Sequence, residues 1–142
     1  MLKNLVIALM AVVLISGMGF AQEEMQEAPE AAITVEEMVF CTSVENRTPV
    51  EPAAEFNNDV GKVSCFTKIV GVTEASEFYH VYYHNDVEMA KVKLTVKGTP
   101  WRTWSNKTIM ENWLGDWKVE VQDADGNVIK SGNFKIVKPA ME

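Results

Sequence analysis

Residues 101–107 combine the side-chain types that bind sugars and peptides, because two indoles and two cations occur within one short segment. On an extended strand, successive side chains point to opposite faces, so Trp101 and Trp104 cannot both lie on one buried side. The outer indole would stack on a sugar or a peptide, and Arg102 or Lys107 would add polar contacts. The alternative is a local bend after the preceding proline that lets both rings pack into the core or cover its open end. The candidate ligand-binding residues are Trp101, Arg102, Trp104, Lys107, His80 and Tyr82.

His80 and His84 are the only histidines in the chain, and imidazole is a common metal ligand. Both point to one side of a strand, but four residues at about 3.3 Å each separate them by roughly 13 Å, too far for one ion. No cysteine pair nearby has ligand spacing, so we expect neither a metal site nor a cofactor. The structural alternative places one histidine in a hydrogen bond in or near the core and the other at a strand end.

Catalytic and phosphate-binding functions are disfavoured by the rest of the sequence. A net charge of −7 repels phosphate backbones and anionic lipid surfaces, so we expect no nucleic-acid partner. Serine, histidine and acidic residues are present, but no nucleophile elbow gives them catalytic roles. Residues 123–127 faintly resemble a calcium loop, yet glycine stands at the fourth position instead of the sixth, which indicates a hairpin turn. We therefore predict that the protein is not an enzyme.

The first 21 residues have the pattern of a secretory signal peptide. Lys3 supplies the positive start, residues 5–15 form an apolar run, and Ala21 ends a small-residue cleavage site. The apolar run is shorter than the ~20 residues of a spanning helix and no second run follows, so we expect no transmembrane segment after cleavage. Residues 22–32 carry four glutamates without a basic residue, which predicts a flexible acidic leader. We expect a periplasmic or secreted protein.

Cys41 and Cys65 are the two cysteines of this chain. Cysteine pairs in an oxidising compartment are more often bridged than free, so the sequence predicts a disulfide between them. Such a bridge would contribute roughly 3 kcal/mol by restricting the unfolded chain. The alternative is two separately buried thiols. A catalytic cysteine has the least support, because no neighbouring base indicates a lowered thiol pKa.

Downstream of the leader, short β-like segments alternate with turn signals, and no helical period of 3.6 is sustained. Two prolines predict that residues 45–59 form a loop. Tight hairpin turns are expected at residues 84–87 and at Asp125-Gly126, the second of type I′. The predicted strands are residues 33–44, 62–70, 78–84, 89–96, 101–107, 117–122 and 128–137.

About seven short strands with regular turns favour an all-β fold, an immunoglobulin-like antiparallel β-sandwich. In such a sheet one face is buried and the other faces water, which explains the period of two in the strands. A barrel is the alternative architecture. We expect one domain, residues 33–138, because this length suffices for a core without help from a metal.

Four short motifs together resemble one bacterial protein family. They are residues 45–50 (ENRTPV), residues 59–62 (DVGK) leading to 65–67 (CFT), residues 80–84 (HVYYH) and residues 101–107 (WRTWSNK). Over most of residues 33–137 the chain resembles the bacterial domain of unknown function 2914 (DUF2914). The resemblance implies a bacterial exported domain and supplies no activity. At Asn85-Asp86 the family would be expected to have Asn-Gly, from which this chain departs.

Three functional hypotheses share this fold. The first is a binding module that recognises a protein or an envelope glycan, with an exposed tryptophan beside Arg102 and a shallow groove. The second is a structural or accessory domain of a cell-envelope assembly, with all four tryptophans buried. The third, an uncharacterised hydrolase, requires a concave pocket with convergent titratable groups. We adopt the first as the working hypothesis.

Overall fold

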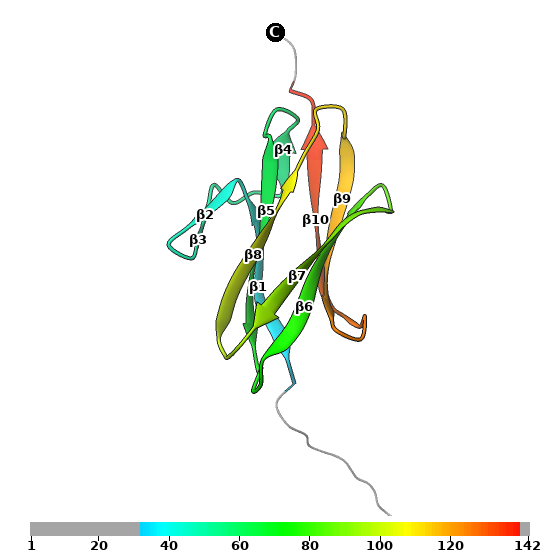
Figure 1. Ribbon diagram of the computed structural model, residues 1–142. Helices are drawn as coiled ribbons and strands as arrows, with labels where there is room; N and C mark the ends of the chain where they lie inside the picture. Colours follow the sequence, from blue (N-terminus) through cyan, green and yellow to red (C-terminus); the bar gives the residue numbers. More distant parts are fainter. Residues whose placement is uncertain (1–31, 140–142) are drawn as a thin grey trace, which may run out of the picture. The chain divides into compact units, whose positions relative to one another are not determined.

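The structure is a computed structural model that describes residues 32–139, and all regular secondary structure in this range is β-strand (Figure 1). The predicted signal peptide, residues 1–21, and residues 22–31 of the predicted leader lie outside the described residues. Within residues 32–139 no segment forms a helix with the length and apolarity needed to cross a bilayer. The predicted all-β class is confirmed.

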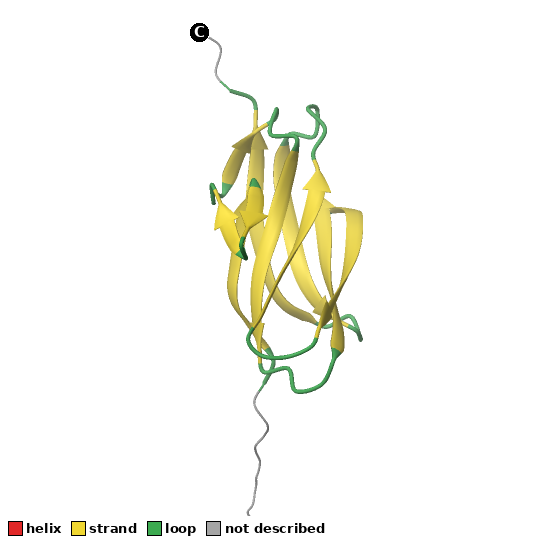
Figure 2. Ribbon diagram, turned by 60° about the vertical axis from the view of Figure 1, so that its left-hand side comes forward, coloured by secondary structure: helices red, strands yellow, loops and turns green. Residues whose placement is uncertain are grey.

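Ten strands occur in the described residues. They are β1 (Thr34–Cys41), β2 (Ser43–Glu45), β3 (Thr48–Val50), β4 (Glu55–Asn57), β5 (Lys62–Val70), β6 (Ser76–His84), β7 (Val87–Val96), β8 (Trp101–Thr108), β9 (Gly115–Asp123) and β10 (Val128–Val137). One sheet has the order β1-β5-β8, a second has the order β4-β10-β9-β6-β7, and β2 pairs with β3 in a small hairpin. Figure 2 shows the larger sheets as the two layers of a sandwich.

The core lies between these two layers. Cys65 of β5 packs in one apolar cluster with Tyr82 of β6, Trp117 of β9 and Phe134 of β10. The rings of Trp117 and Phe134 are stacked, with their centroids 5.7 Å apart. Removal of large aromatic side chains from water is the main driving force that holds the layers together.

The seven long strands have the order of an immunoglobulin-like sandwich. When β1, β5 and β8 are taken as strands A, B and E, strands β10, β9, β6 and β7 correspond to G, F, C and C′. Strand D, which lies beside E in constant-type domains, has no counterpart among residues 32–139. The predicted sandwich is therefore confirmed, and β4 is an exception to antiparallel pairing because it runs parallel to β10.

Two predicted boundaries in the first part of the domain are wrong. The predicted first strand, residues 33–44, is divided at Thr42 into β1 and β2. The predicted loop, residues 45–59, contains β3 and β4, although Pro49 lies in β3. Proline is tolerated there because β3 pairs only with β2 and has a free side. Alternation in the sequence does not reveal these strands because each has three residues.

The two hairpin turns of the five-stranded sheet differ in type. Asn85 and Asp86 connect β6 to β7 with φ values of 49° and 69°, which fit the predicted tight turn. Between β9 and β10, Gly126 alone has a positive φ, 89°, so the type I′ prediction for Asp125-Gly126 is wrong. The Asp123 side chain holds this longer turn, because its Oδ1 accepts hydrogen bonds from two backbone amides of the turn, each at 2.9 Å.

Cys41 and Cys65 are both free and buried, so the predicted disulfide is not present in the structure. In the β1–β5 ladder, Cys65 lies opposite Phe40, whereas Cys41 lies opposite Ser64. Residues opposite each other share a face, and neighbours along a strand point to opposite faces. The two thiols therefore lie on opposite faces of one sheet, which is incompatible with a bridge. Burial raises both thiol pKa values, which keeps the sulfurs protonated at neutral pH.

Candidate functional site

Strand β8 places its side chains alternately on the two faces of the three-stranded sheet. Trp101 packs against an apolar cluster between the layers. Trp104 lies on the outer face, is 36% exposed, and stacks on Phe66 of β5 with the ring centroids 6.4 Å apart. One inner and one outer indole is the arrangement that the alternation predicted. The alternative, in which both rings pack into the core or cover its open end, is wrong for Trp104, which stacks on Phe66 on the outer face.

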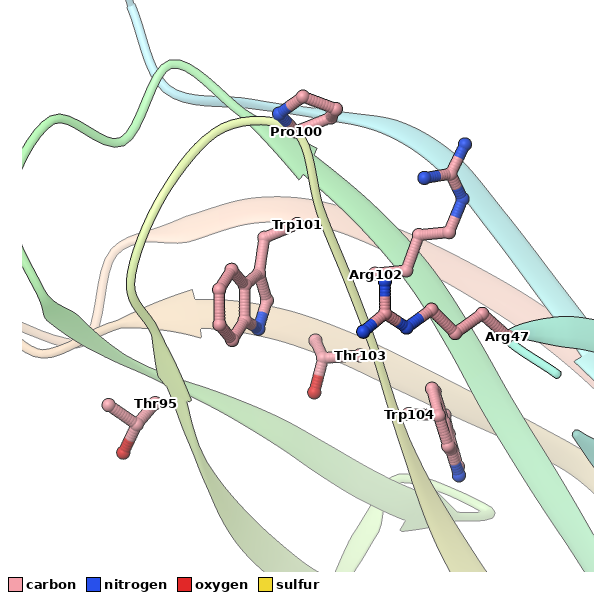
Figure 3. Close-up of a pocket in the computed structure, with 7 residues that line it drawn as sticks. All are labelled: Arg47, Thr95, Pro100, Trp101, Arg102, Thr103 and Trp104. Carbon is pink, nitrogen blue, oxygen red and sulfur yellow. The ribbon is translucent and has the colours of Figure 1, made fainter.

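A pocket of about 500 Å³ opens beside the first half of β8 (Figure 3). Thr95 of β7 contributes one wall, and four consecutive residues of β8 contribute another. Arg47 enters from the β2–β3 hairpin, and Figure 3 shows its side chain extending toward β8. Two guanidinium groups and two indoles therefore share one pocket. The lining residues are Arg47, Thr95, Pro100, Trp101, Arg102, Thr103 and Trp104.

The two arginines of this pocket have no carboxylate partner among the described residues. Neither Arg47 nor Arg102 forms an ion pair within residues 32–139, whereas four lysines of the same range do. The shortest of these pairs joins Lys68 Nζ to Glu36 Oε1 at 2.8 Å. The pocket wall itself contains no acidic residue. Because a guanidinium group binds carboxylates and phosphates bidentately, the pocket has the chemistry of an anion-binding recess.

Arg47 is a pocket residue that the sequence did not predict. It forms the turn of the β2–β3 hairpin with Asn46, and the two φ values are 60° and 52°. Glycine is favoured here, because a side chain in the left-handed region costs roughly 1–2 kcal/mol. A two-residue hairpin turn of type I′ requires a positive φ at both central residues, as the Asn85-Asp86 turn also shows. The one sequence signal at this position is the ENRTPV motif, which carried the family resemblance and gave no role to the arginine.

Lys107, a predicted ligand-binding candidate, does not line the pocket. Its Nζ lies 5.0 Å from the centre of the Trp113 ring and donates a hydrogen bond to the Thr108 carbonyl at 3.2 Å. This cation–π contact ties the end of β8 to the connection that leads into β9. The role of Lys107 in the structure is therefore to stabilise that connection.

His80 and Tyr82, also predicted as ligand-binding candidates, are fully buried and form no part of the surface. Ser105 Oγ lies 2.6 Å from His80 Nδ1 and 2.7 Å from the Tyr82 hydroxyl. His80 Nε2 lies 3.2 Å from Thr67 Oγ1, which itself donates to the Thr103 carbonyl at 3.1 Å. Because the Thr67 hydroxyl donates elsewhere, it accepts from His80 Nε2. The Ser105 hydroxyl then donates to His80 Nδ1 and accepts from Tyr82.

This buried chain of hydrogen bonds orders the core and is not a catalytic centre. Burial lowers the pKa of His80 to about 4, so the imidazole is neutral at physiological pH. Burial also raises the pKa of Tyr82, which keeps its hydroxyl protonated. Ser105 and His80 resemble two members of a hydrolytic triad, but Thr67 stands where a triad has its acid. Ser105 is also not among the residues that line the pocket.

His84 confirms the structural alternative for the two histidines. It is the last residue of β6, its ring stacks on Trp117 at a centroid distance of 4.7 Å, and its Nε2 lies 2.7 Å from the Leu114 carbonyl oxygen. His80, by contrast, is hydrogen-bonded in the core. In the part of the chain that the structure describes, no three side chains of histidine, cysteine, aspartate or glutamate converge as a metal site.

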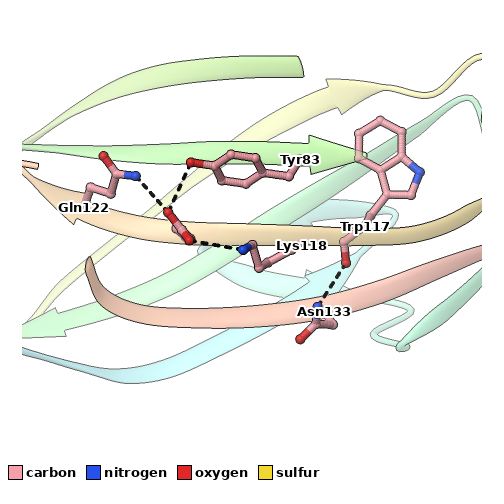
Figure 4. Close-up of polar contacts among 6 residues, drawn as sticks. Tyr83, Trp117, Lys118, Gln122 and Asn133 are labelled. Atoms are coloured by element: carbon pink, nitrogen blue, oxygen red, sulfur yellow. Dashed lines mark hydrogen bonds and ion pairs between the residues drawn. The ribbon is translucent and has the colours of Figure 1, made fainter. Parts of the chain in front are cut away.

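A second polar cluster lies on the outer face of the five-stranded sheet (Figure 4). Glu120 Oε1 accepts hydrogen bonds from the Tyr83 hydroxyl at 3.2 Å and from the Gln122 amide at 2.9 Å. Lys118 Nζ lies 3.3 Å from Glu120 Oε2 and 4.9 Å from the centre of the Tyr83 ring. Burial alone raises the pKa of Glu120, but these hydrogen bonds and the lysine charge outweigh it and lower the pKa. The polar groups of this cluster satisfy one another, unlike the two arginines of the pocket.

Residues 75–136 match a family described as a protein of unknown function, DUF2914. Over this range the chain is similar to the DUF2914 family. The match confirms the suspected family over residues 75–136, which contain the motifs at 80–84 and 101–107. The motifs at 45–50 and 59–67 lie before the matched range. Arg47 lies before the DUF2914 match, so the pocket combines residues from inside and outside the matched range. A comparison with curated proteins found no match for the chain.

Proposed function

We propose that this protein is an exported, non-enzymatic binding module that recognises a protein or a glycan of the bacterial cell envelope. The observation that carries the proposal is the pocket at β8, where two arginines without an ion pair in residues 32–139 lie beside two indoles. A purely structural domain is expected to bury all its tryptophans, whereas Trp104 is 36% exposed next to Arg102. Export is supported by the signal-peptide pattern of the first 21 residues.

The chemistry of the pocket favours a ligand with negative charge and with a face that stacks on an indole. Arg47 and Arg102 supply fork-shaped donors for carboxylate or phosphate groups. Trp104 supplies an exposed aromatic face, on which a sugar ring or a peptide plane would pack. An acidic glycan and an acidic peptide both meet these requirements.

A catalytic role has less support, because the groups with strongly shifted pKa values lie away from the pocket. His80, Tyr82 and Cys65 are buried between the layers, and their pKa shifts follow from that burial. The pocket wall contains threonines, arginines, tryptophans and a proline, and no carboxylate, histidine or cysteine. A hydrolase needs convergent groups that move a proton at neutral pH, and this wall supplies none.

Binding measurements with matched charge variants test the proposal. The purified chain is titrated with oligogalacturonate, with a neutral oligosaccharide and with a glutamate-rich peptide in a calorimeter. Arg102→Gln is expected to weaken binding of an acidic ligand at least tenfold, because it removes one of the two cations of the pocket. Lys130→Gln removes an exposed positive charge on β10, away from the pocket, and should leave the affinity unchanged.

Two results would overturn the proposal. The first is an absence of binding across all three ligands, which would favour a structural or accessory domain. The second is equal binding by the wild-type protein and Arg102→Gln, which would move the binding site away from this pocket. Urea unfolding of both variants shows whether a loss of affinity reflects a loss of folded protein.

A further inference from the structure

Strand β8 is an edge strand with one free side. It pairs with β5, and no other strand of residues 32–139 pairs with it. Its eight residues are in continuous register with β5, from Lys62 opposite Thr108 to Ile69 opposite Trp101. An edge of this length presents a row of backbone donors and acceptors to which another chain can add.

The other three edges of the larger sheets are each protected against such pairing. On β1, the Phe40 carbonyl accepts a hydrogen bond from the Ala53 amide at 2.9 Å, and the register shifts near the start of the strand. Strand β4 has three residues. Strand β7 carries the exposed side chains of Lys91 and Lys93. Covered edges, short strands and edge lysines are the usual features that prevent an edge strand from pairing with another chain. Strand β8 is therefore the edge that remains available for such pairing.

The ladder identifies the backbone groups of β8 that point to the free side. The Ile109 amide donates to the Gly61 carbonyl at 2.9 Å, one position beyond the last β5–β8 pair. Antiparallel residues alternate between pairs that exchange hydrogen bonds with the neighbouring strand and pairs whose N–H and C=O groups point away. In this unbroken register, the backbone groups of Arg102, Trp104 and Asn106 point away from β5. Arg102 and Trp104 therefore present free backbone groups beside the pocket that their side chains line.

We infer that an extended, acidic peptide segment of a partner protein adds to β8 as a further strand. The inference rests on the proposed binding function and narrows its ligand from a protein or a glycan to a peptide strand. The added strand would occupy the position that strand D has beside strand E in constant-type immunoglobulin domains. In strand addition, main-chain hydrogen bonds supply affinity and pockets for alternate side chains supply specificity.

The acidic character of the peptide follows from charge complementarity. Alternate side chains of an added strand would lie on the outer face, where Arg47 and Arg102 have no carboxylate partner within residues 32–139. The intervening side chains would point toward the part of the pocket lined by Trp101 and Thr95. A second copy of β8 fits less well, because pairing of two copies would bring like-charged arginines onto one outer face.

Amide hydrogen exchange followed by NMR tests strand addition directly. The probe is a capped eight-residue peptide of alternating glutamate and valine. At saturation, exchange at Arg102, Trp104 and Asn106 is expected to slow at least tenfold, because their amides gain a hydrogen bond. Exchange at Thr103 and Ser105 should stay unchanged, because their amides already point to β5.

Two N-methylated versions of the peptide separate backbone pairing from side-chain contact. One version is methylated on the glutamate amides and the other on the valine amides, so each blocks one edge of the peptide strand. Strand addition uses one edge, so one version should lose affinity at least tenfold while the other binds like the parent peptide. This comparison uses the unchanged protein, and it therefore does not depend on how well any variant folds.

A matched pair of protein variants tests the same contact from the side of β8. Asn106→Pro removes an outward-pointing amide without removing a ladder hydrogen bond to β5, and proline is tolerated at such edge positions. Asn106→Thr keeps the amide. Both variants lose the side-chain hydrogen bond at 2.6 Å between Ser64 and Asn106, so they are matched in that respect. Peptide affinity should fall at least tenfold in Asn106→Pro and stay close to wild type in Asn106→Thr.

The possible results distinguish this inference from the proposed function. Binding of oligogalacturonate without binding of the peptide would overturn strand addition and leave the proposed function standing. Peptide binding with unchanged exchange at Trp104, or equal affinity of both methylated peptides, would also overturn strand addition. Protection at β8 without peptide, together with a doubled mass in solution, would show that a second copy occupies the edge. Absence of binding by every ligand would overturn both proposals.

Discussion

At the scale of single residues, the backbone of Arg47 is held in a conformation that favours glycine, while its side chain lines the pocket at β8. The backbone of Arg47 forms the strained turn, and its guanidinium group lines the proposed binding pocket. A substitution that removes the guanidinium can relieve the backbone strain at the same time. The free energy of unfolding would then rise while the affinity for a ligand falls.

Arg47→Gly is expected to raise the free energy of unfolding by about 0.5–1 kcal/mol, because glycine adopts a positive φ without steric cost. Its affinity for an acidic ligand should fall at least tenfold. Urea unfolding and calorimetric titration measure the two effects. Arg47→Ala keeps the strain and also lacks the guanidinium, so it should weaken binding equally without a gain in stability. A glycine variant that is less stable than the alanine variant would contradict the assignment of strain.

The buried His80 determines a pH dependence of stability. Its pKa is lowered to about 4 in the folded protein, whereas an unfolded chain has a histidine pKa of about 6.5. Between these values the unfolded chain binds a proton that the folded protein excludes, so stability falls as the pH falls from about 6.5 to about 4. The loss of unfolding free energy from this residue approaches about 3 kcal/mol at the lower limit.

Urea unfolding at about pH 7 and about pH 4.5 measures this dependence. His80→Gln is expected to be less stable than wild type at neutral pH, because the buried hydrogen bonds change, and to lose less stability on acidification. His84→Gln is the comparison variant, because it removes the other imidazole, which lies at a strand end and outside the buried chain of hydrogen bonds. If His80→Gln kept the full loss on acidification, a group other than this imidazole would be responsible.

At the scale of elements, the two hairpin turns of the five-stranded sheet should respond differently to glycine. Asp86→Gly is expected to raise the free energy of unfolding by about 0.5–1 kcal/mol, because it places Asn-Gly in a turn with two positive φ values. Asp125→Gly should give no gain, because Gly126 alone has a positive φ there and glycine makes the unfolded chain more flexible. Thermal unfolding compares the two variants. Equal shifts of Tm would contradict the difference in turn type.

Long strands were predictable because one face of each strand is buried and the other faces solvent, so apolar and polar residues alternate along the sequence. The predicted residues 62–70 coincide with β5, and residues 101–107 fall one residue short of β8. The three-residue strands were not predictable, since no period is visible over that length. The type of the Asp125-Gly126 turn was not predictable either, because the Asp123 side chain selects a longer turn.

The candidate site was predictable where its residues follow one strand. Alternation along residues 101–107 predicted that one indole is outward and one inward, and the structure identifies Trp104 as the outward one. The same alternation in β6 would have placed His80 and Tyr82 on the buried face, because both lie at even spacing from the buried Phe78. Arg47 could not be found in this way, because tertiary packing brings a separate hairpin to the pocket.

At the scale of the whole described domain, the two thiols contribute no covalent constraint. Because Cys41 and Cys65 lie on opposite faces of a sheet, Tm should be the same with and without dithiothreitol. A bridge would have contributed roughly 3 kcal/mol, enough to shift Tm by several degrees. Iodoacetamide should not label the native protein, because both thiols are buried, and should label both after unfolding. A mass two hydrogens below that of the reduced chain would contradict this assignment.

The β2–β3 hairpin forms a two-stranded sheet that shares no ladder with the two larger sheets, yet it supplies one of the two cations of the pocket. Its tip can therefore be replaced without disturbing the framework that holds β8. Exchange of residues 46–47 would therefore change the charge of the proposed binding pocket while the two larger sheets stay intact.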